Sequence, residues 1–226
     1  MAACRRCPRL VEQREAVAAR KRRAYAHEVY WGAPVPGFGD PDARLILVGL
    51  APGAHGSNRT GRMFTGDASG DFLYPALHRA GLASQPLSRD RGDGLHLRGV
   101  WITAVARCVP PGNAPTLAEL ERCRSWLAHD LDALDEAGAL LALGKLAHDG
   151  VLRHYRDRGL AVRLAHHPFA HGALHRLERL PGADRARALP LLDAYHVSFQ
   201  NTNTGRLSAA MFDAVLIDAK RLAGLS

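Results

Sequence analysis

Short apolar runs alternate along the chain with longer stretches in which apolar residues recur every three or four positions. The runs cover 44–49, 99–105, 138–144 and about 191–197, and they resemble strands that are buried on both faces. The helical patterns cover about 10–27, 69–80, 116–134, 145–154 and 208–222. This alternation predicts an α/β fold, in which helices cover both faces of a parallel sheet.

Polar and turn-forming residues mark where the predicted helices begin and end. Ser69 is placed to cap the second helix, and Gly81 follows its end. Thr116 and Glu119 form a capping box, and Ser208 precedes the last helix. The prolines and glycines of 34–41 predict a turn-rich connector before the first strand, and residues 84–98 are expected to form a loop.

Composition narrows the class of protein. The 226 residues are 47% hydrophobic, enough for one domain spanning 1–226, with 1–30 as a basic N-terminal arm that carries arginines such as Arg14. Lys and Arg number 30 against 22 Asp and Glu, and this net charge of +8 favours a polyanionic partner such as nucleic acid. We find no apolar signal segment and no run long enough to span a bilayer, so a cytoplasmic protein with no membrane partner is expected.

A glycine-rich loop at 49–67 directly follows the first predicted strand. Glycines let the backbone approach a flat ligand closely, here most directly at Gly53 and neighbouring Ala54. Ligands of open α/β sheets bind at the carboxyl ends of strands. The loop is therefore the predicted active site, although an ordinary long connection is the simpler alternative.

The chain has four cysteines, Cys4, Cys7, Cys108 and Cys123, separated by 2, 100 and 14 residues. Four thiolates can close one tetrahedral site around a 4Fe-4S cluster or a structural zinc ion. Zinc ribbons usually have two close CxxC pairs, so the long second spacing favours the cluster. Four unrelated buried cysteines remain the alternative.

Several motifs together resemble the type-5 iron-sulfur uracil-DNA glycosylases. They are the CxxC start, GLAPGAHGSNRTGR with FTGDASG, the strand ending in Arg107-Cys108, HHPFAHG, and HVSFQNTNTGRLS from His196. The resemblance implies a three-layer αβα sandwich with a central four-stranded parallel sheet. It also implies a 4Fe-4S cluster on the four cysteines and hydrolysis of the N-glycosidic bond of a deaminated base.

The chain departs from the wider superfamily at three positions. Ala51 stands where many uracil-DNA glycosylases carry an Asp or Asn that positions water, and Ala104 stands where the type-4 branch carries an Asn that reads uracil. Both alanines look typical of type 5, which is associated with a wider substrate range. Met63 replaces a usual proline, and we expect this change to affect loop rigidity more than chemistry.

Three residues are predicted to be catalytic. Asp67 is the one carboxylate of the loop and is expected to orient water, while a cap of the following helix is its alternative role. His196 is expected to donate a hydrogen bond to the base oxygen as negative charge grows there. Asn113 is expected to assist at the mouth of the site, with a role in a proline-rich turn as its alternative.

Further residues are predicted to bind the substrate. Phe64 is the candidate stacking platform for a flipped base, and Ser198 and Asn201 are expected to hold phosphates. Arg206 and Leu207 suggest a wedge that enters the base stack. Leu207 also fits a hydrophobic staple, in which an apolar residue just before the cap packs against the last helix. The histidines at 166, 167 and 171 are expected to lie along DNA rather than bind metal, because no acidic or thiol partner is evident.

These features predict a monofunctional, monomeric DNA glycosylase of base excision repair that flips and removes uracil and other deaminated bases (hypoxanthine, xanthine). The pocket segments lack the lysine that a lyase requires. The alternatives are a non-catalytic module that binds damaged DNA and holds structural zinc, and a glycosylase narrowly specific for uracil.

Overall fold

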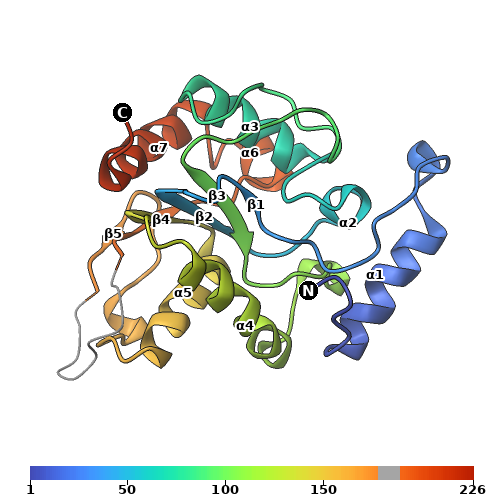
Figure 1. Ribbon diagram of the computed structural model, residues 1–226, viewed down its shortest axis with the longest axis horizontal. Helices are drawn as coiled ribbons and strands as arrows, with labels where there is room; N and C mark the ends of the chain where they lie inside the picture. The colour runs from blue at the N-terminus through green and yellow to red at the C-terminus, as the bar shows by residue number, and fades with distance from the viewer. Residues whose placement is uncertain (178–188) are drawn as a thin grey trace.

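The computed structural model describes residues 1–177 and 189–226 and contains a six-stranded sheet of order β1-β3-β2-β4-β6-β5 (Figure 1). The four central strands pair in parallel, as predicted. A short antiparallel strand is added at each edge. The strands are β1 Phe38–Gly39, β2 Leu45–Gly49, β3 Val100–Ala104, β4 Ala139–Leu143, β5 Leu174–His175 and β6 Leu191–Ala194.

Helices cover both faces of the sheet, so the three-layer prediction is confirmed. The α-helices are α1 Pro8–Arg20, α2 Ser57–Thr60, α3 Ala68–Arg79, α4 Leu117–Ala133, α5 Lys145–Asp157, α6 Phe199–Asn203 and α7 Ala209–Ala223. α3 and α7 pack on one face, and α4 and α5 pack on the other (Figure 1). None of the described helices is long and apolar enough to cross a membrane.

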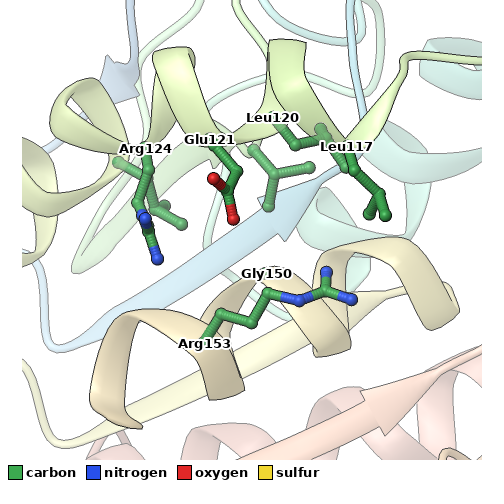
Figure 2. Close-up of a pocket in the computed structure, with 8 residues that line it drawn as sticks. Leu117, Leu120, Glu121, Arg124, Gly150 and Arg153 are labelled. Carbon is green, nitrogen blue, oxygen red and sulfur yellow. The ribbon is translucent and has the colours of Figure 1, made fainter. Parts of the chain in front are cut away.

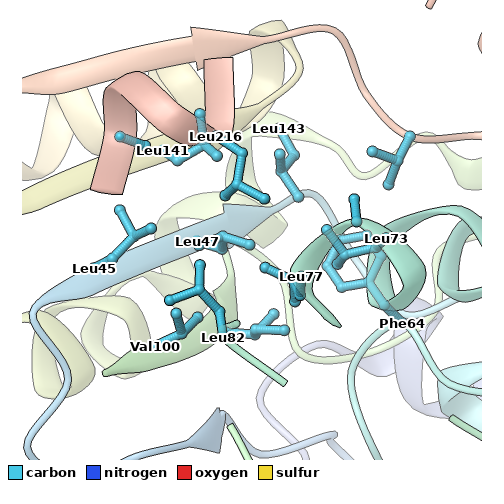
Figure 3. Close-up of a cluster of buried hydrophobic side chains, with 14 of the residues drawn as sticks. Leu45, Leu47, Phe64, Leu73, Leu77, Leu82, Val100, Leu141, Leu143 and Leu216 are labelled. Carbon is cyan, nitrogen blue, oxygen red and sulfur yellow. The ribbon is translucent and has the colours of Figure 1, made fainter. Parts of the chain in front are cut away.

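Each face of the sheet has its own core because successive side chains of a strand point to opposite sides. In β2, Leu45 and Leu47 belong to the cluster that α3 and α7 complete (Figure 3). Ile46 and Val48 belong to the cluster that α4 and α5 complete. All four side chains are fully buried, which explains why the sequence of β2 shows no polar alternation.

The helix caps agree with the sequence except at α3. Thr116 and Glu119 form the predicted capping box of α4, and the Ser208 hydroxyl accepts a hydrogen bond from Met211 N at 3.2 Å. The cap of α3 is Asp67, so the prediction of Ser69 was wrong. A carboxylate two residues earlier can accept from two free N–H groups of the first turn, which one hydroxyl does less well.

The N-terminal helix is shorter and more tightly packed than predicted. α1 ends at Arg20 because Lys21 has a positive φ of 52°, and only a short 3-10 turn, Arg23–Tyr25, follows. Arg14 is not solvated, since only 2% of it is exposed. Its backbone carbonyl accepts a hydrogen bond from Asn58 of α2 at 3.2 Å. An ion pair of 2.7 Å between Arg9 and Glu119 joins α1 to α4.

Candidate active site and cysteine cavity

A cavity of about 720 Å³ lies at the carboxyl ends of the central strands, where Gly49 ends β2 and Ala104 ends β3. This volume is typical of a ligand site. The cavity brings together seven of the predicted site residues: Gly53, Ala54, Phe64, Asp67, Asn113, His196 and Ser198. The glycine-rich loop and the segment after β6, which are far apart in sequence, therefore form one site.

Asp67 divides its two carboxylate oxygens between the helix and the cavity. Oδ1 accepts hydrogen bonds from Ser69 N at 3.1 Å and Gly70 N at 3.3 Å. Oδ2 has no donor among residues 1–177 and 189–226, and it faces the loop, where a Cβ added to Gly56 would lie 1.8 Å from it. Burial raises the pKa of Asp67, although the two backbone hydrogen bonds oppose this shift. The capping role and the catalytic role are therefore compatible.

His196 is neutral at physiological pH. Burial lowers the pKa of its imidazole to about 4. Within the part of the chain that the structure describes, no side chain or backbone group bonds to its ring nitrogens, and its ring centroid lies 6.1 Å from that of Phe64. A neutral imidazole keeps one N–H donor, which remains available for a ligand in the cavity.

Phe64 lies against the end of β2 in an uncommon backbone conformation. Its φ is 51°, in the region where bulky residues are rare. A Cβ on Gly49 would lie 2.8 Å from its ring, so glycine at that position admits the aromatic side chain. Only 9% of Phe64 is exposed. The ring therefore forms a fixed apolar wall of the cavity.

Two buried arginines hold the glycine-rich loop in place. Arg59 donates to the carbonyls of His55 at 2.6 Å and Gly66 at 2.9 Å. Arg62 forms an ion pair of 2.6 Å with Asp93, a residue of the segment expected to be a simple loop. This arginine holds the pKa of the Asp93 carboxyl well below its usual range, together with two backbone donors and against the cost of burial.

Asn113 lies at the mouth of the cavity, in the turn Pro111–Asn113 and with a positive φ of 57°. Three residues that were predicted to contact DNA lie outside the cavity lining: Asn201, Arg206 and Leu207. Asn201 donates to the carbonyl of His196 at 2.7 Å, and the Arg206 guanidinium lies 4.6 Å from the centroid of the Tyr195 ring. Asn201 thus holds the backbone of His196 in place.

Leu207 is only 1% exposed and packs in the same core cluster as Phe212 of α7. This is the staple arrangement, with the apolar residue before the Ser208 cap beside the fourth residue of the helix. The structure thus corrects the prediction of Leu207 as a wedge, since the side chain already fills the core.

The sequence did not single out several residues of the cavity wall. His55 lies there with Arg22 and Tyr25, and its Nδ1 lies 3.0 Å from the Tyr30 hydroxyl. Phe199 also lines the cavity and is 63% exposed. Its position directly after Ser198 was the available signal, because an exposed aromatic residue beside a ligand site is unusual.

The four cysteines line a second cavity, between the start of α1 and α4. No three of their Sγ atoms lie within 4.8 Å of one another, within the described residues. Four thiolates around one zinc ion at 2.3 Å would be about 3.8 Å apart. The four thiols are therefore not arranged as a closed zinc site, and the cavity that they line measures only about 20 Å³.

The wall of the cysteine cavity carries buried donors without partners. Arg14 Nε, Arg107 Nε and Nη1, and Trp126 Nε1 have no hydrogen-bond acceptor, and all three residues line this cavity. Unpaired buried donors cost about 1–3 kcal/mol each. Their concentration here makes the wall of this cavity complementary to an acceptor-rich group.

Cationic side chains surround the thiols. Arg14 Nη1 donates to Cys108 Sγ at 3.1 Å, and Arg6 Nε donates to Cys4 Sγ at 3.4 Å. Burial raises the pKa of Cys123 to about 11, and burial also raises the pKa of Cys108. The arginines supply the positive charge that an anionic thiolate site needs.

A third pocket, between α4 and α5, is far smaller than the cavity beside Asp67, at about 30 Å³ (Figure 2). Leu117 and Leu120 lie on one side, with Gly150 and Arg153 on the other. It has room for one or two water molecules but not for a nucleobase. The cavity beside Asp67 and His196 is therefore the candidate active site.

Comparisons with known proteins identify the family of this chain. The family model of the uracil DNA glycosylase superfamily matches residues 36–220. The chain is 55% identical over 225 residues to a type-5 uracil-DNA glycosylase of Thermus thermophilus, covering 100% of this chain and 96% of the relative. It is 51% identical to a type-5 enzyme of Mycobacterium leprae, covering 98% and 92%. A type-4 uracil-DNA glycosylase of Pyrobaculum aerophilum is 36% identical over half of each chain.

Proposed function

Because the chain belongs to the type-5 branch of the uracil-DNA glycosylase superfamily, we propose that it removes uracil from DNA by hydrolysing the N-glycosidic bond. The observation that carries the proposal is the 720 Å³ cavity, whose lining includes both Asp67, with one oxygen free of donors, and His196, with an unbonded ring. The enzyme leaves an abasic site and acts in base excision repair.

Each side chain of the cavity has a role in this reaction. The flipped uracil stacks against Phe64, and the N–H of neutral His196 donates to a base oxygen that becomes negative as the bond breaks. Asp67 Oδ2 orients the water that attacks the sugar, while Oδ1 stays bonded to the start of α3. Asn113 and Ser198 contact the DNA substrate at the mouth of the cavity.

We propose that the enzyme also removes hypoxanthine and xanthine. Ala51 and Ala104 line the cavity and offer no side-chain amide or carboxylate to reject a purine. The backbone at Gly53 and Ala54 leaves further room. A uracil-only specificity would instead require polar side chains matched to the edge of uracil.

We also propose that Cys4, Cys7, Cys108 and Cys123 bind a 4Fe-4S cluster. The unpaired donors of Arg14, Arg107 and Trp126 and the surrounding positive charge support an anionic group at the thiols. The 14-residue separation of Cys108 and Cys123 favours the cluster over zinc. The cluster would supply iron–thiolate bonds that fasten α1 to α4, and no step of base release depends on it.

DNA that contains deaminated bases is the proposed partner, and the net charge of +8 favours it. All groups assigned to the reaction lie in one chain, which supports a monomer. We place the enzyme in the cytoplasm, where a bacterial or archaeal chromosome would lie.

The deciding experiment follows uracil release from a duplex oligonucleotide with one uracil, scored by alkaline cleavage at the abasic site. Wild type is expected to cleave the uracil strand and to leave a thymine control intact. Borohydride is expected to trap no covalent adduct. Binding of the uracil duplex without any release would overturn the proposal and favour a module that only binds damaged DNA.

A further inference from the structure

Three buried residues outside the active site form a second group of potential metal ligands. His148 comes from α5, His175 from β5 and Asp193 from β6, and their ligand atoms all lie within 4.8 Å of one another. No other group of His, Cys, Asp or Glu in the ranges 1–177 and 189–226 converges this closely. Asp193 is the acidic partner that the histidine-rich segment lacks when the sequence alone is considered.

The hydrogen bonds fix the orientation of His148. Its Nε2 lies 2.9 Å from the carbonyl oxygen of His167, which can only accept, so Nε2 carries a proton. Its Nδ1 lies 2.8 Å from Asp193 Oδ1. A proton or a cation must therefore lie between this nitrogen and the carboxylate, because two lone pairs would otherwise face each other.

The surroundings favour the cation. His175 Nε2 also lies 2.9 Å from Asp193 Oδ2, so two imidazole nitrogens converge on the two oxygens of one carboxylate, and the His167 ring centroid lies 5.7 Å from that of His175. No described lysine or arginine pairs with Asp193. A histidine that donates one N–H to a backbone carbonyl while its other nitrogen faces the remaining ligands is the usual arrangement around a metal.

We propose that His148 Nδ1, His175 Nε2 and the carboxylate of Asp193 bind one divalent cation of the zinc class. Imidazole and carboxylate together suit zinc better than magnesium or calcium. The fourth position is open to water or, after rotation of its ring, to His167. The ion would join α5, β5 and β6 three residues before His196. Its role is to hold in place the chain segment that leads from β6 to His196.

The test loads the full-length protein with zinc and measures zinc and iron per chain. Wild type is expected to bind one zinc in addition to iron, and its X-ray absorption spectrum should show nitrogen and oxygen neighbours at about 2.0 Å without sulfur at about 2.3 Å. His175→Asn is expected to lose the zinc and keep the iron. The matched control is His166→Asn, an exposed neighbour that should keep both metals.

Cobalt substitution in wild type gives a readout that needs no variant, since a site without thiolates shows no sulfur-to-cobalt charge-transfer band. The proposal is overturned if wild type takes up no zinc, if the bound zinc has sulfur neighbours, or if His175→Asn retains it. Two protons on the His148 ring by nitrogen NMR of the zinc-treated protein would also overturn it and identify an imidazolium–carboxylate pair. Zinc uptake does not depend on glycosylase activity, so the two proposals fail separately.

Discussion

Asp67 illustrates how one residue can serve both a helix and a reaction. Its first oxygen caps α3 and its second faces the cavity, so a neutral isostere should separate the two roles. Asparagine is as good a cap as aspartate. The fold should therefore survive a substitution that removes the negative charge.

Asp67→Asn is expected to slow single-turnover uracil release by roughly 10²- to 10⁴-fold while the melting temperature changes little. Burial raises the pKa of Asp67, and the carboxylate is the active form, so the wild-type rate should rise as pH increases through this raised pKa and then level off. The Asp67→Asn variant should not show this rise of the rate with pH, which is the acid limb of the profile. If the variant keeps the acid limb of the wild-type profile, that limb belongs to another group, and His196, whose pKa burial lowers to about 4, is the candidate.

The sequence suggests Leu207 as the wedge, but Leu207 is buried, and Phe199 is the exposed apolar side chain that lines the cavity. Phe199→Ala is expected to leave the free energy of unfolding within about 0.5 kcal/mol of wild type, because 63% of the side chain is exposed. It should weaken binding to a uracil duplex by about 1–3 kcal/mol, the value of one aromatic stacking contact.

Leu207→Ala is the matched comparison. It should destabilise the fold by about 2–5 kcal/mol, because it opens a hole in a core where the side chain is 1% exposed. Chemical denaturation measures the free energy of unfolding of both variants, and fluorescence anisotropy measures their affinity for the uracil duplex. The assignment is wrong if the leucine variant is stable but loses duplex binding.

At the level of elements, the glycine-rich loop works because its backbone lies close to Asp67, the cap that precedes α3. A Cβ at Gly53 would lie 2.6 Å from Asp67 Oδ2, and one at Gly56 would lie closer still. These glycines are needed for close approach, since neither has a positive φ. The loop and the helix cap therefore form one unit.

Gly56→Ala is expected to displace the Asp67 carboxylate and to lower the rate about as much as Asp67→Asn. It should also cost about 1 kcal/mol of stability through the weakened cap. Gly92→Ala is the control, since its added Cβ would meet nothing closer than 3.4 Å. Single-turnover kinetics should show loss of activity for Gly56→Ala only. Full activity of Gly56→Ala would contradict the proposed close contact between the loop backbone and the Asp67 carboxylate.

The attachment of α1 provides a second prediction at this scale. Cys108→Ser should abolish stable iron binding and leave α1 held mainly by the Arg9–Glu119 ion pair and the Asn58 bond. The amides of α1 should then exchange at least about tenfold faster, whereas those of α7 should not change. Iron analysis and hydrogen exchange measure this, and unchanged protection of α1 would show that the cysteine site does not fasten the helix.

The extent to which elements could be predicted depended on their length. β2 and β4 are five residues long and uniformly apolar, so both were clear from the sequence. β1 and β5 have two residues each, too few for any periodicity to show. Leu207 was ambiguous for a different reason, because one apolar residue before a cap fits both a surface loop and a staple.

For the whole molecule, the excess of positive charge is expected to govern DNA binding. Arg22 is exposed at the cavity and has no described carboxylate partner. Arg22→Ala should weaken binding to damaged and undamaged duplexes alike and reduce the slope of log K against log salt by about one. Titrations at several salt concentrations measure the slope, and a loss confined to uracil DNA would instead place Arg22 in base recognition.

The site as a whole could be assembled from sequence only in part. Asp67, His196 and the four cysteines were found because they lie in motifs. Asp193 was missed because an aspartate inside an apolar strand gives no sign of which histidines it will meet. Contacts between distant segments depend on the sheet order, which periodicity does not reveal.

The cysteine cavity joins positions 4 and 7 to positions 108 and 123, and this separation sets an order of events during synthesis. The ribosome adds roughly 5–20 residues per second, so the first two thiols wait at least several seconds for their partners to emerge. The N-terminal helix is thus made first and fastened late. Until then its apolar face and two free thiols are open to solvent, which makes the nascent chain most vulnerable to oxidation during this interval.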